Sequence, residues 1–291
     1  MHELISITAM AALLATVSGA ATAQERVLDP SGEWKLSQQD EYCLATNSFG
    51  AGEDTVGLYL YQYGPGKAYQ VVVAGSGIPR NDGKAELVRI SLSETQEPQQ
   101  TPIVVSQARG RGMISFQLIG QGGFTRFGRS WSGRGIEQYD VRLPSFADRI
   151  SIAGGDLQPV TLHAGDLSPT MTQLEDCARK LADAWYPQVT SLGEPAKGPE
   201  LLNGMEVIDR IKWPPALLLN RVSLMLQIRM IVDADGRAKD CWIQAPSMRD
   251  KDRRLICSAF EGLGRFTPAR DATGNDRDAV FRTTAIMFVF D

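Results

Sequence analysis

Few residues of this chain have the types and spacing that catalysis needs. His163 is the only histidine apart from His2, so any serine or cysteine nucleophile activated by histidine would depend on it. The chain contains no G-x-S-x-G motif. His163 stands near a predicted strand end, beside Gly165 and Asp166, where a structural or solvated role is more usual. We therefore predict a protein that is not an enzyme. The alternative is an envelope enzyme whose catalytic site lies in the β-rich N-terminal domain.

The four cysteines could form disulfides or hold a metal ion. No C-x-x-C motif occurs and histidine is scarce, so the sequence argues against a zinc site. An even number of cysteines is typical of disulfides in an exported protein. Three pairings are possible. Because the cysteines divide two and two between the domains predicted below, we favour Cys43–Cys177 and Cys241–Cys257.

Asp233, Asp235 and Gly236 make up half of the pattern of a calcium-binding loop. The third acidic position and the distal glutamate of such a loop are missing. Aspartate and glycine are also the residues that a tight turn between two strands requires. We predict a hairpin turn here, and no metal or other cofactor in the protein.

One segment combines arginines with aromatic residues. No acidic residue occurs from Pro98 to Ile136. Guanidinium and aromatic groups together bind anionic or sugar-containing molecules through hydrogen bonds and stacking. The alternative, which the sequence favours, is a glycine-rich hairpin loop with solvated arginines and with aromatics packed on the sheet. The possible ligand surface, for a glycan or an anionic envelope ligand, consists of Arg126, Phe127, Arg129, Trp131 and Arg134.

The N-terminus has the pattern of an export signal. An apolar run, Leu4–Val17, is followed by small residues that end in Ala21-Thr22-Ala23, an A-x-A cleavage pattern. We predict a signal peptide over residues 1–23. Met1-His2-Glu3 lacks the usual basic residue, so an uncleaved membrane anchor stays open as the alternative. A spanning helix needs about 20 strongly apolar residues, and the polar residues in this stretch argue against it.

Residues 24–187 predict a β-rich domain that ends in a helix. Short apolar or alternating runs are separated by Gly, Pro, Asn and Asp, which is typical of a sandwich or a barrel. Ser168 and Pro169 have the pattern of a helix start, and apolar residues then recur at helical spacing up to Trp185. The predicted strands are Val56–Tyr63, Tyr69–Ala74, Ala85–Leu92, Ile103–Val105, Met113–Ile119 and Tyr139–Leu143.

A predicted linker, residues 188–203, separates this domain from the C-terminal domain, residues 204–291. Alternate residues from Val222 to Val232 are apolar, which predicts a strand with one buried face. A second strand over 237–245 follows, then a helix that opens with a capping pattern at Ser247, then a long final strand over 278–290. The predicted fold is α+β, with a small antiparallel sheet packed on a helix in this domain.

Four short motifs of the C-terminal third occur in a fixed order. Trp213-Pro214-Pro215-Ala216 precedes the alternating strand, Val232-Asp233-Ala234-Asp235-Gly236-Arg237 forms the turn, and Phe266-Thr267-Pro268-Ala269-Arg270-Asp271 follows the helix. The last strand ends in Ile286-Met287-Phe288-Val289-Phe290. With these motifs, residues from about 204 to 291 resemble the C-terminal domain family of TonB, the energy-transducing protein of Gram-negative bacteria.

The resemblance implies that a partner segment adds as a strand beside the sheet of this domain. An exposed strand edge offers unpaired N–H and C=O groups to an extended peptide. The position of the last strand in the family assigns that edge to the final strand here. The predicted partner-binding residues are Thr283, Thr284, Ala285, Ile286, Met287, Phe288 and Val289.

The chain also departs from that family. TonB keeps a membrane anchor and a long proline-rich spacer, neither of which we expect here, and Leu217–Arg221 replaces the glycines that often precede the first long strand. We predict a periplasmic interaction protein whose partners are envelope proteins, with an outer-membrane receptor segment as one possibility. The alternatives are an anchored energy transducer for outer-membrane transport and an envelope glycan-binding protein. The net charge of −4 gives no reason to expect a nucleic-acid partner.

Overall fold

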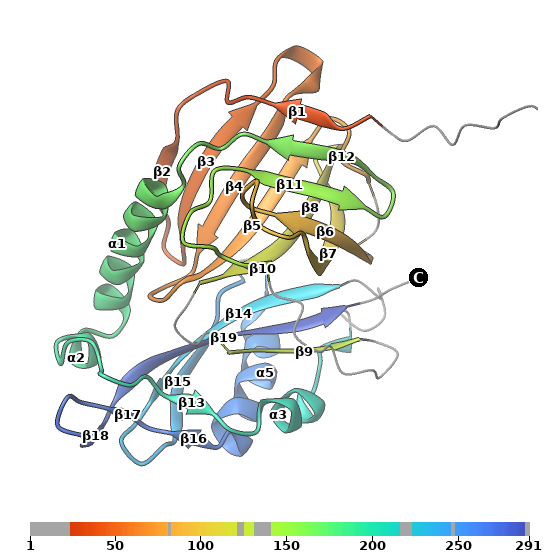
Figure 1. The fold of residues 1–291 in the computed structure, drawn as a ribbon. Helices are drawn as coiled ribbons and strands as arrows, with labels where there is room; N and C mark the ends of the chain where they lie inside the picture. The colour runs from red at the N-terminus through yellow and green to blue at the C-terminus, as the bar shows by residue number, and fades with distance from the viewer. Residues whose placement is uncertain are drawn as a thin grey trace, which may run out of the picture.

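The protein is mixed α+β and consists mostly of sheet (Figure 1). The computed structural model describes residues 24–80, 83–120, 125–130, 141–215, 223–245 and 248–288. A large curled sheet with one long helix makes up the upper part of Figure 1, and a smaller sheet backed by helices makes up the lower part. The predicted α+β class is therefore confirmed in coarse outline.

The large sheet has the strand order β1-β12-β11-β6-β7-β8-β5-β4-β3-β2, with β10 parallel to β8. Each predicted strand of the N-terminal domain lies in it. Its strands are β1 (Arg26–Leu28), β2 (Lys35–Gln38), β3 (Cys43–Phe49), β4 (Val56–Gln62), β5 (Ala68–Gly75), β6 (Ala85–Ser91), β7 (Gln99–Ala108), β8 (Arg111–Ile119), β10 (Val141–Arg142), β11 (Ile150–Gly154) and β12 (Leu157–Leu162).

Alternation along each strand directs one set of side chains into the curl. In β4, Val56, Leu58 and Leu60 are fully buried, whereas Tyr59 and Tyr61, which alternate with them, are only half-buried. The ends of the sheet are joined by the chain after β1. Leu28 pairs with Leu162 of β12, and Pro30 then bridges to Phe49 of β3. The curl corresponds to the barrel-like alternative of the sequence prediction.

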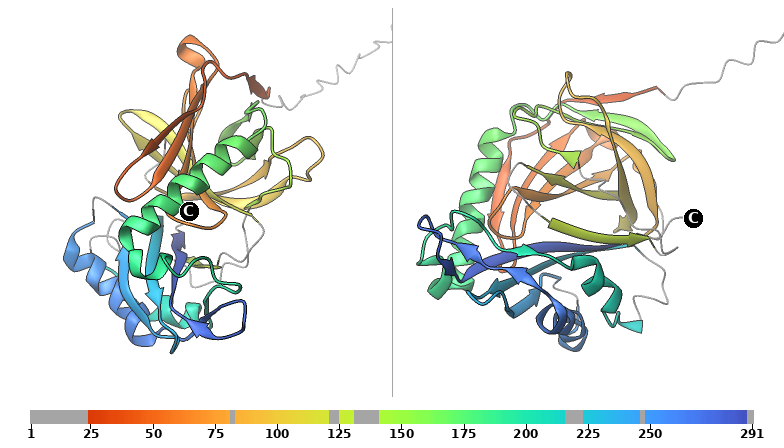
Figure 2. Two further views of the ribbon diagram at one scale, coloured as in Figure 1. Left: turned by 90° about the vertical axis from the view of Figure 1, so that its left-hand side faces the viewer. Right: turned by 60° about the horizontal axis from the view of Figure 1, so that its bottom comes forward.

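Helix α1 (Ser168–Trp185) packs along β2, β3 and β4 and contributes to the same core. Figure 2 shows it running along the curled sheet toward the C-terminal part. The apolar stripe predicted from the sequence is buried, and Cys177 forms a disulfide with Cys43 of β3. The predicted N-cap, Ser168, is wrong by one residue. The N-cap is Leu167, whose carbonyl accepts the first helical hydrogen bond, from the Met171 N–H at 2.9 Å.

The C-terminal part contains the predicted order of strand, strand, helix and strand. Its sheet has the order β15-β14-β19-β9, with β9 (Thr125–Ser130) supplied by the N-terminal region. Two short ladders, β13 with β16 and β17 with β18, lie beside it. The other elements are α2 (Pro187–Thr190), β13 (Glu200–Leu201), α3 (Gly204–Arg210), β14 (Leu224–Val232), β15 (Ala238–Ile243), α5 (Asp250–Leu263), β16 (Phe266–Thr267), β17 (Ala269–Arg270), β18 (Asp276–Arg277) and β19 (Ala279–Phe288).

Helix α5 lies against β15, and the second disulfide, Cys241–Cys257, joins the two. Both predicted cysteine pairings are thus confirmed. The helix begins at Asp250 with Arg249 as its N-cap, three residues after the predicted capping pattern at Ser247, which lies outside the described residues. The segment predicted as a linker, 188–203, includes the end of α2 and all of β13.

A first core fills the curled sheet and its contact with α1, and a second core lies between α5, α3 and the C-terminal sheet. None of the helices among the described residues has the length and apolar character to span a membrane. The predicted signal peptide, residues 1–23, lies outside the described part of the chain.

Candidate functional site

The predicted partner-binding strand, β19, is an inner strand of its sheet and not an edge strand. On one side it pairs antiparallel with β14, from Ala279 opposite Val232 to Met287 opposite Leu224. On the other side its second half pairs in parallel with β9 (Figure 1). The expectation of a free edge at Thr283–Phe288 is therefore corrected, because a segment of the same chain occupies it. Val289 lies outside the described residues.

Strand β9 contains part of the predicted ligand surface. Arg126, Phe127 and Arg129 lie in register with Thr284, Ala285 and Met287, respectively. The two segments that sequence analysis selected for different reasons are consequently neighbouring strands. Trp131 and Arg134, the other members of that predicted surface, lie outside the described residues.

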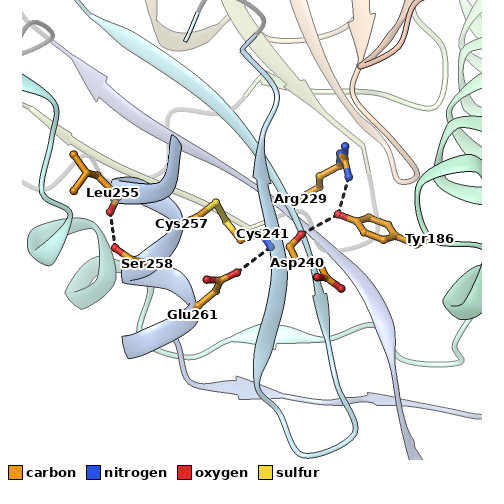
Figure 3. Close-up of a disulfide and its surroundings, with 8 residues drawn as sticks. All are labelled: Tyr186, Arg229, Asp240, Cys241, Leu255, Cys257, Ser258 and Glu261. Carbon is orange, nitrogen blue, oxygen red and sulfur yellow. Dashed lines mark hydrogen bonds between the residues drawn. A yellow bond between two sulfur atoms is a disulfide. The ribbon is translucent and has the colours of Figure 1, made fainter. Parts of the chain in front are cut away.

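The opposite edge strand, β15, has two backbone groups occupied by side chains. The Cys241 N–H donates to Glu261 Oε1 of α5 at 3.1 Å, next to the disulfide (Figure 3). The Asp240 C=O accepts from the Tyr186 hydroxyl, also at 3.1 Å. Asp240 itself has a φ of 53°, a left-handed conformation that interrupts the regular ladder. The edge at β15 is thus less suited to an added strand than the side of β19 along which β9 pairs.

The face of the C-terminal sheet opposite α5 is polar and buried. Alternation along β14 predicted a single buried face, but Gln227 and Arg229 on its second face are also nearly inaccessible to solvent. Thr284 and Arg282 lie opposite them on β19. This polar face contacts the curled sheet and α1, which explains why the prediction of one buried face was wrong.

Arg229 is held among aromatic rings. Its guanidinium carbon lies 4.0 Å from the ring centroid of Trp185 and 5.8 Å from that of Trp242, within the range of cation–π attraction. It also donates to the Tyr186 hydroxyl at 2.7 Å and lies 3.7 Å from the Glu41 carboxylate. Burial raises the pKa of Tyr186, while Arg229 acts in the opposite direction. One arginine of the C-terminal sheet therefore contacts both α1 and the start of β3.

A chain of buried hydrogen bonds crosses the same interface. Gln117 Nε2 of β8 donates to the Thr284 hydroxyl, which donates to Gln227 Oε1, both at 2.9 Å. Gln244 Nε2 donates to the carbonyls of Glu41 and Tyr63, at 2.7 and 2.8 Å. Polar groups buried in this way fix the relative position of two surfaces, because each loses its partner if the surfaces shift.

Arg282 is a second buried charge of the interface. Its guanidinium donates to the Gly64 carbonyl and to the Pro65 carbonyl, the latter at 2.6 Å, in the turn between β4 and β5. Burial lowers the pKa of Arg282 to about 10, and nearby Tyr69 and Tyr63 act in the opposite direction. Sequence analysis missed Arg229 and Arg282. The only signal available was a charged residue within an otherwise apolar strand.

The other residues that the sequence singled out for possible chemistry make local hydrogen bonds. His163 Nδ1 lies 2.9 Å from the Asp29 carboxylate at the surface, where Asp29 is largely exposed. Asp233 Oδ1 accepts the N–H groups of Asp235 and Arg237, and Gly236 has a φ of 76°, so the predicted hairpin turn is confirmed. Within the described residues, no group of three or more His, Cys, Asp or Glu side chains is placed to hold a metal ion.

Comparison of the chain with protein-family models, with curated proteins and with solved structures gives no match. The resemblance of its C-terminal third to TonB therefore stays a prediction from the motifs.

Proposed function

We propose that this protein is a cell-envelope interaction protein whose C-terminal sheet binds an extended partner segment alongside β19. The position that β9 of the same chain occupies is the one that the segment would take. The proposal keeps the strand addition that the TonB resemblance implies, and it adds an intramolecular occupant of the edge.

The pairing of β9 with β19 is the observation that supports the proposal. Six consecutive residues of β9, Thr125–Ser130, follow β19 in parallel. They belong to the N-terminal region and pair with residues more than 150 positions later in the chain. An edge that accepts one extended segment through main-chain hydrogen bonds can accept another, because those bonds do not depend on side-chain identity.

The disulfides support the proposed location. Two disulfides and no free cysteine among the described residues are consistent with an exported protein, because thiols are kept reduced in the cytosol. Because two backbone groups of β15 are occupied, we place the docking position on the other side of the sheet, along β19. We accordingly place the proposed partner in the periplasm.

A matched pair of proline substitutions tests the proposal. Successive residues of a strand direct their backbone N–H groups to opposite sides, so only one of Phe127→Pro and Gly128→Pro removes an N–H that faces β19. That variant should release β9 from the sheet. The second half of β19 should then exchange its amide hydrogens faster, as measured by hydrogen–deuterium exchange, whereas the other variant should resemble the wild type.

The released variant should also bind a labelled synthetic peptide of residues 123–132, with an affinity roughly tenfold higher than the wild type, whose edge is already occupied. In-cell crosslinking would then identify a natural partner by a linked peptide that maps to β19. The proposal fails if the two proline variants behave alike, or if the released variant does not bind the peptide.

A further inference from the structure

A cavity of about 470 Å³ lies where the curled sheet, α1, the 188–203 segment and β19 meet. This volume is within the range of small-molecule sites, which are frequent between domains. Its apolar lining includes Val189, Pro195 and Phe281. Its charged lining consists of Lys67, Arg179, Arg277, Arg282, Asp183 and Glu194.

Two of the four basic groups also hold the walls of this cavity. Arg282 donates to the Gly64 and Pro65 carbonyls on the side of the curled sheet. Arg277 donates to the carbonyls of Leu192 and Gly193, both at 3.0 Å, in the segment after α2. These acceptors are neutral, so the bonds fix the guanidinium groups without cancelling their charge. Arg179 is ion-paired with Asp176, so three cations, Lys67, Arg277 and Arg282, face the two carboxylates of the lining and leave a small excess of positive charge.

A second cavity, of about 300 Å³, lies on the other side of Lys67 and Gly120, which line both. Helix α1 also forms a wall of both, with Arg179 and Asp183 in the first cavity and Met171 and Glu175 in the second. The lining of the second cavity includes Leu143, Pro144, Ala147, Leu167 and Met171. The two spaces, which we call together the α1 path, have Lys67 between them and apolar side chains in the lining of each.

We propose that this path binds an amphipathic monoanion, a carboxylate that carries a single alkyl chain. Lys67 is exposed and placed between the two cavities, where it can approach a negative group while the chain contacts the apolar walls. The small excess of positive charge in the first cavity, and Glu175 in the second, favour a ligand with one negative charge over one with two. This site is distinct from the second half of β19, so the inference does not depend on strand addition.

Decanoate is a suitable probe, and calorimetric titration of the full mature chain is the measurement. We expect saturable one-to-one binding that Lys67→Gln weakens roughly fivefold, the effect of removing one charge at a partly exposed site. Gly198 lines the first cavity, has no positive φ, and a Cβ there would meet no atom within 4 Å. Gly198→Trp should therefore extend over the cavity without backbone strain and weaken binding further.

Two control variants match these changes away from the cavity. Lys251→Gln removes a lysine from α5, and Gly262→Trp adds the same bulk at another glycine with open space around its Cβ. Both should bind decanoate as the wild type does. Decyl phosphate, with its larger negative charge, should bind more weakly than decanoate.

Three results would overturn the inference. The first is an absence of saturable decanoate binding. The second is equal affinity for neutral decanol, which would remove the role of the basic groups. The third is unchanged binding in both Lys67→Gln and Gly198→Trp when circular dichroism shows that both variants are folded.

Discussion

Each of the two cores of this protein contains one disulfide, but the two disulfides close loops of very different length. The disulfide of the curled sheet joins cysteines 134 residues apart, and the disulfide of the C-terminal domain joins cysteines only 16 residues apart. Each fixes a helix to a strand, α1 to β3 in the first case and α5 to β15 in the second. The first disulfide thus links distant parts of the chain, whereas the second links neighbouring elements of the C-terminal domain, whose one distant strand among the described residues is β9.

The surface between the cores differs from both of them. The two main cores consist of aliphatic and aromatic side chains, whereas the interface combines two small apolar clusters, around Ile286 and Ile231, with buried arginines, glutamines and a threonine. Apolar contact tolerates small shifts, whereas buried hydrogen bonds and a caged guanidinium require one relative position. The polar contacts of the interface therefore specify the relative orientation of the two parts, and its apolar clusters add buried hydrophobic surface.

The largest expected effect is the loss of the long-range disulfide. Replacing Cys43 and Cys177 by alanine should lower the free energy of unfolding by about 5 kcal/mol, because the reduced unfolded chain regains the freedom of a long loop. Replacing Cys241 and Cys257 should lower it by about 3 kcal/mol. Denaturant unfolding of both double variants measures the difference. Equal losses would show that loop length does not govern their contributions.

The interface should respond to removal of its caged arginine. Arg229→Met should lower the free energy of unfolding by about 2 kcal/mol, because cation–π contacts are lost and Glu41 loses its cation. Arg237→Met is the matched control, since Arg237 lies in the hairpin after β14 with its side chain 77% exposed. Its loss should stay below about 0.5 kcal/mol. Similar losses in both variants would argue against an energetic role for the cage.

The smallest expected effect concerns alkaline pH. The Tyr69 hydroxyl donates to Glu175 Oε1 at 2.7 Å, and burial together with that carboxylate raises the Tyr69 pKa above its usual value near 10. A raised folded pKa contributes stability that is complete below pH 10 and is lost as the pH rises through the folded value.

Tyr69→Phe should therefore cost about 1 kcal/mol at pH 7, where the hydrogen bond is lost. Above pH 10, its stability should fall less steeply than that of the wild type, by up to about 1.4 kcal/mol per pH unit. Burial also raises the pKa of Tyr63, so Tyr63→Phe should change the slope in the same direction. Chemical denaturation at pH 7, 10 and 11 measures both effects, and parallel curves for variant and wild type would contradict this assignment.

The sequence predicted the positions of strands more reliably than it predicted which strands pair with one another. Strand β4 was expected at Val56–Tyr63 and occurs at Val56–Gln62. The final strand was expected over 278–290 and is described at Ala279–Phe288. These elements follow from alternation and turn residues, which are local properties. The edge position assigned to β19 was wrong because pairing with β9 joins segments more than 150 residues apart, and no local pattern records such a contact.

The sequence alone predicted six strands of the curled sheet, helix α1, the order of strands and helix in the C-terminal domain, the hairpin turn at Asp233 and the mixed α+β class, and it favoured the two disulfide pairings that occur. Periodicity, turn chemistry and the division of cysteines between the two halves are sufficient for these. Only the tertiary structure decided which strands became edges, that Arg229 and Arg282 would be buried, and that a cavity would form beside α1. Those features depend on how the curled sheet and α1 pack against the C-terminal sheet. The free energy of this packing is distributed over contacts between residues far apart in the chain.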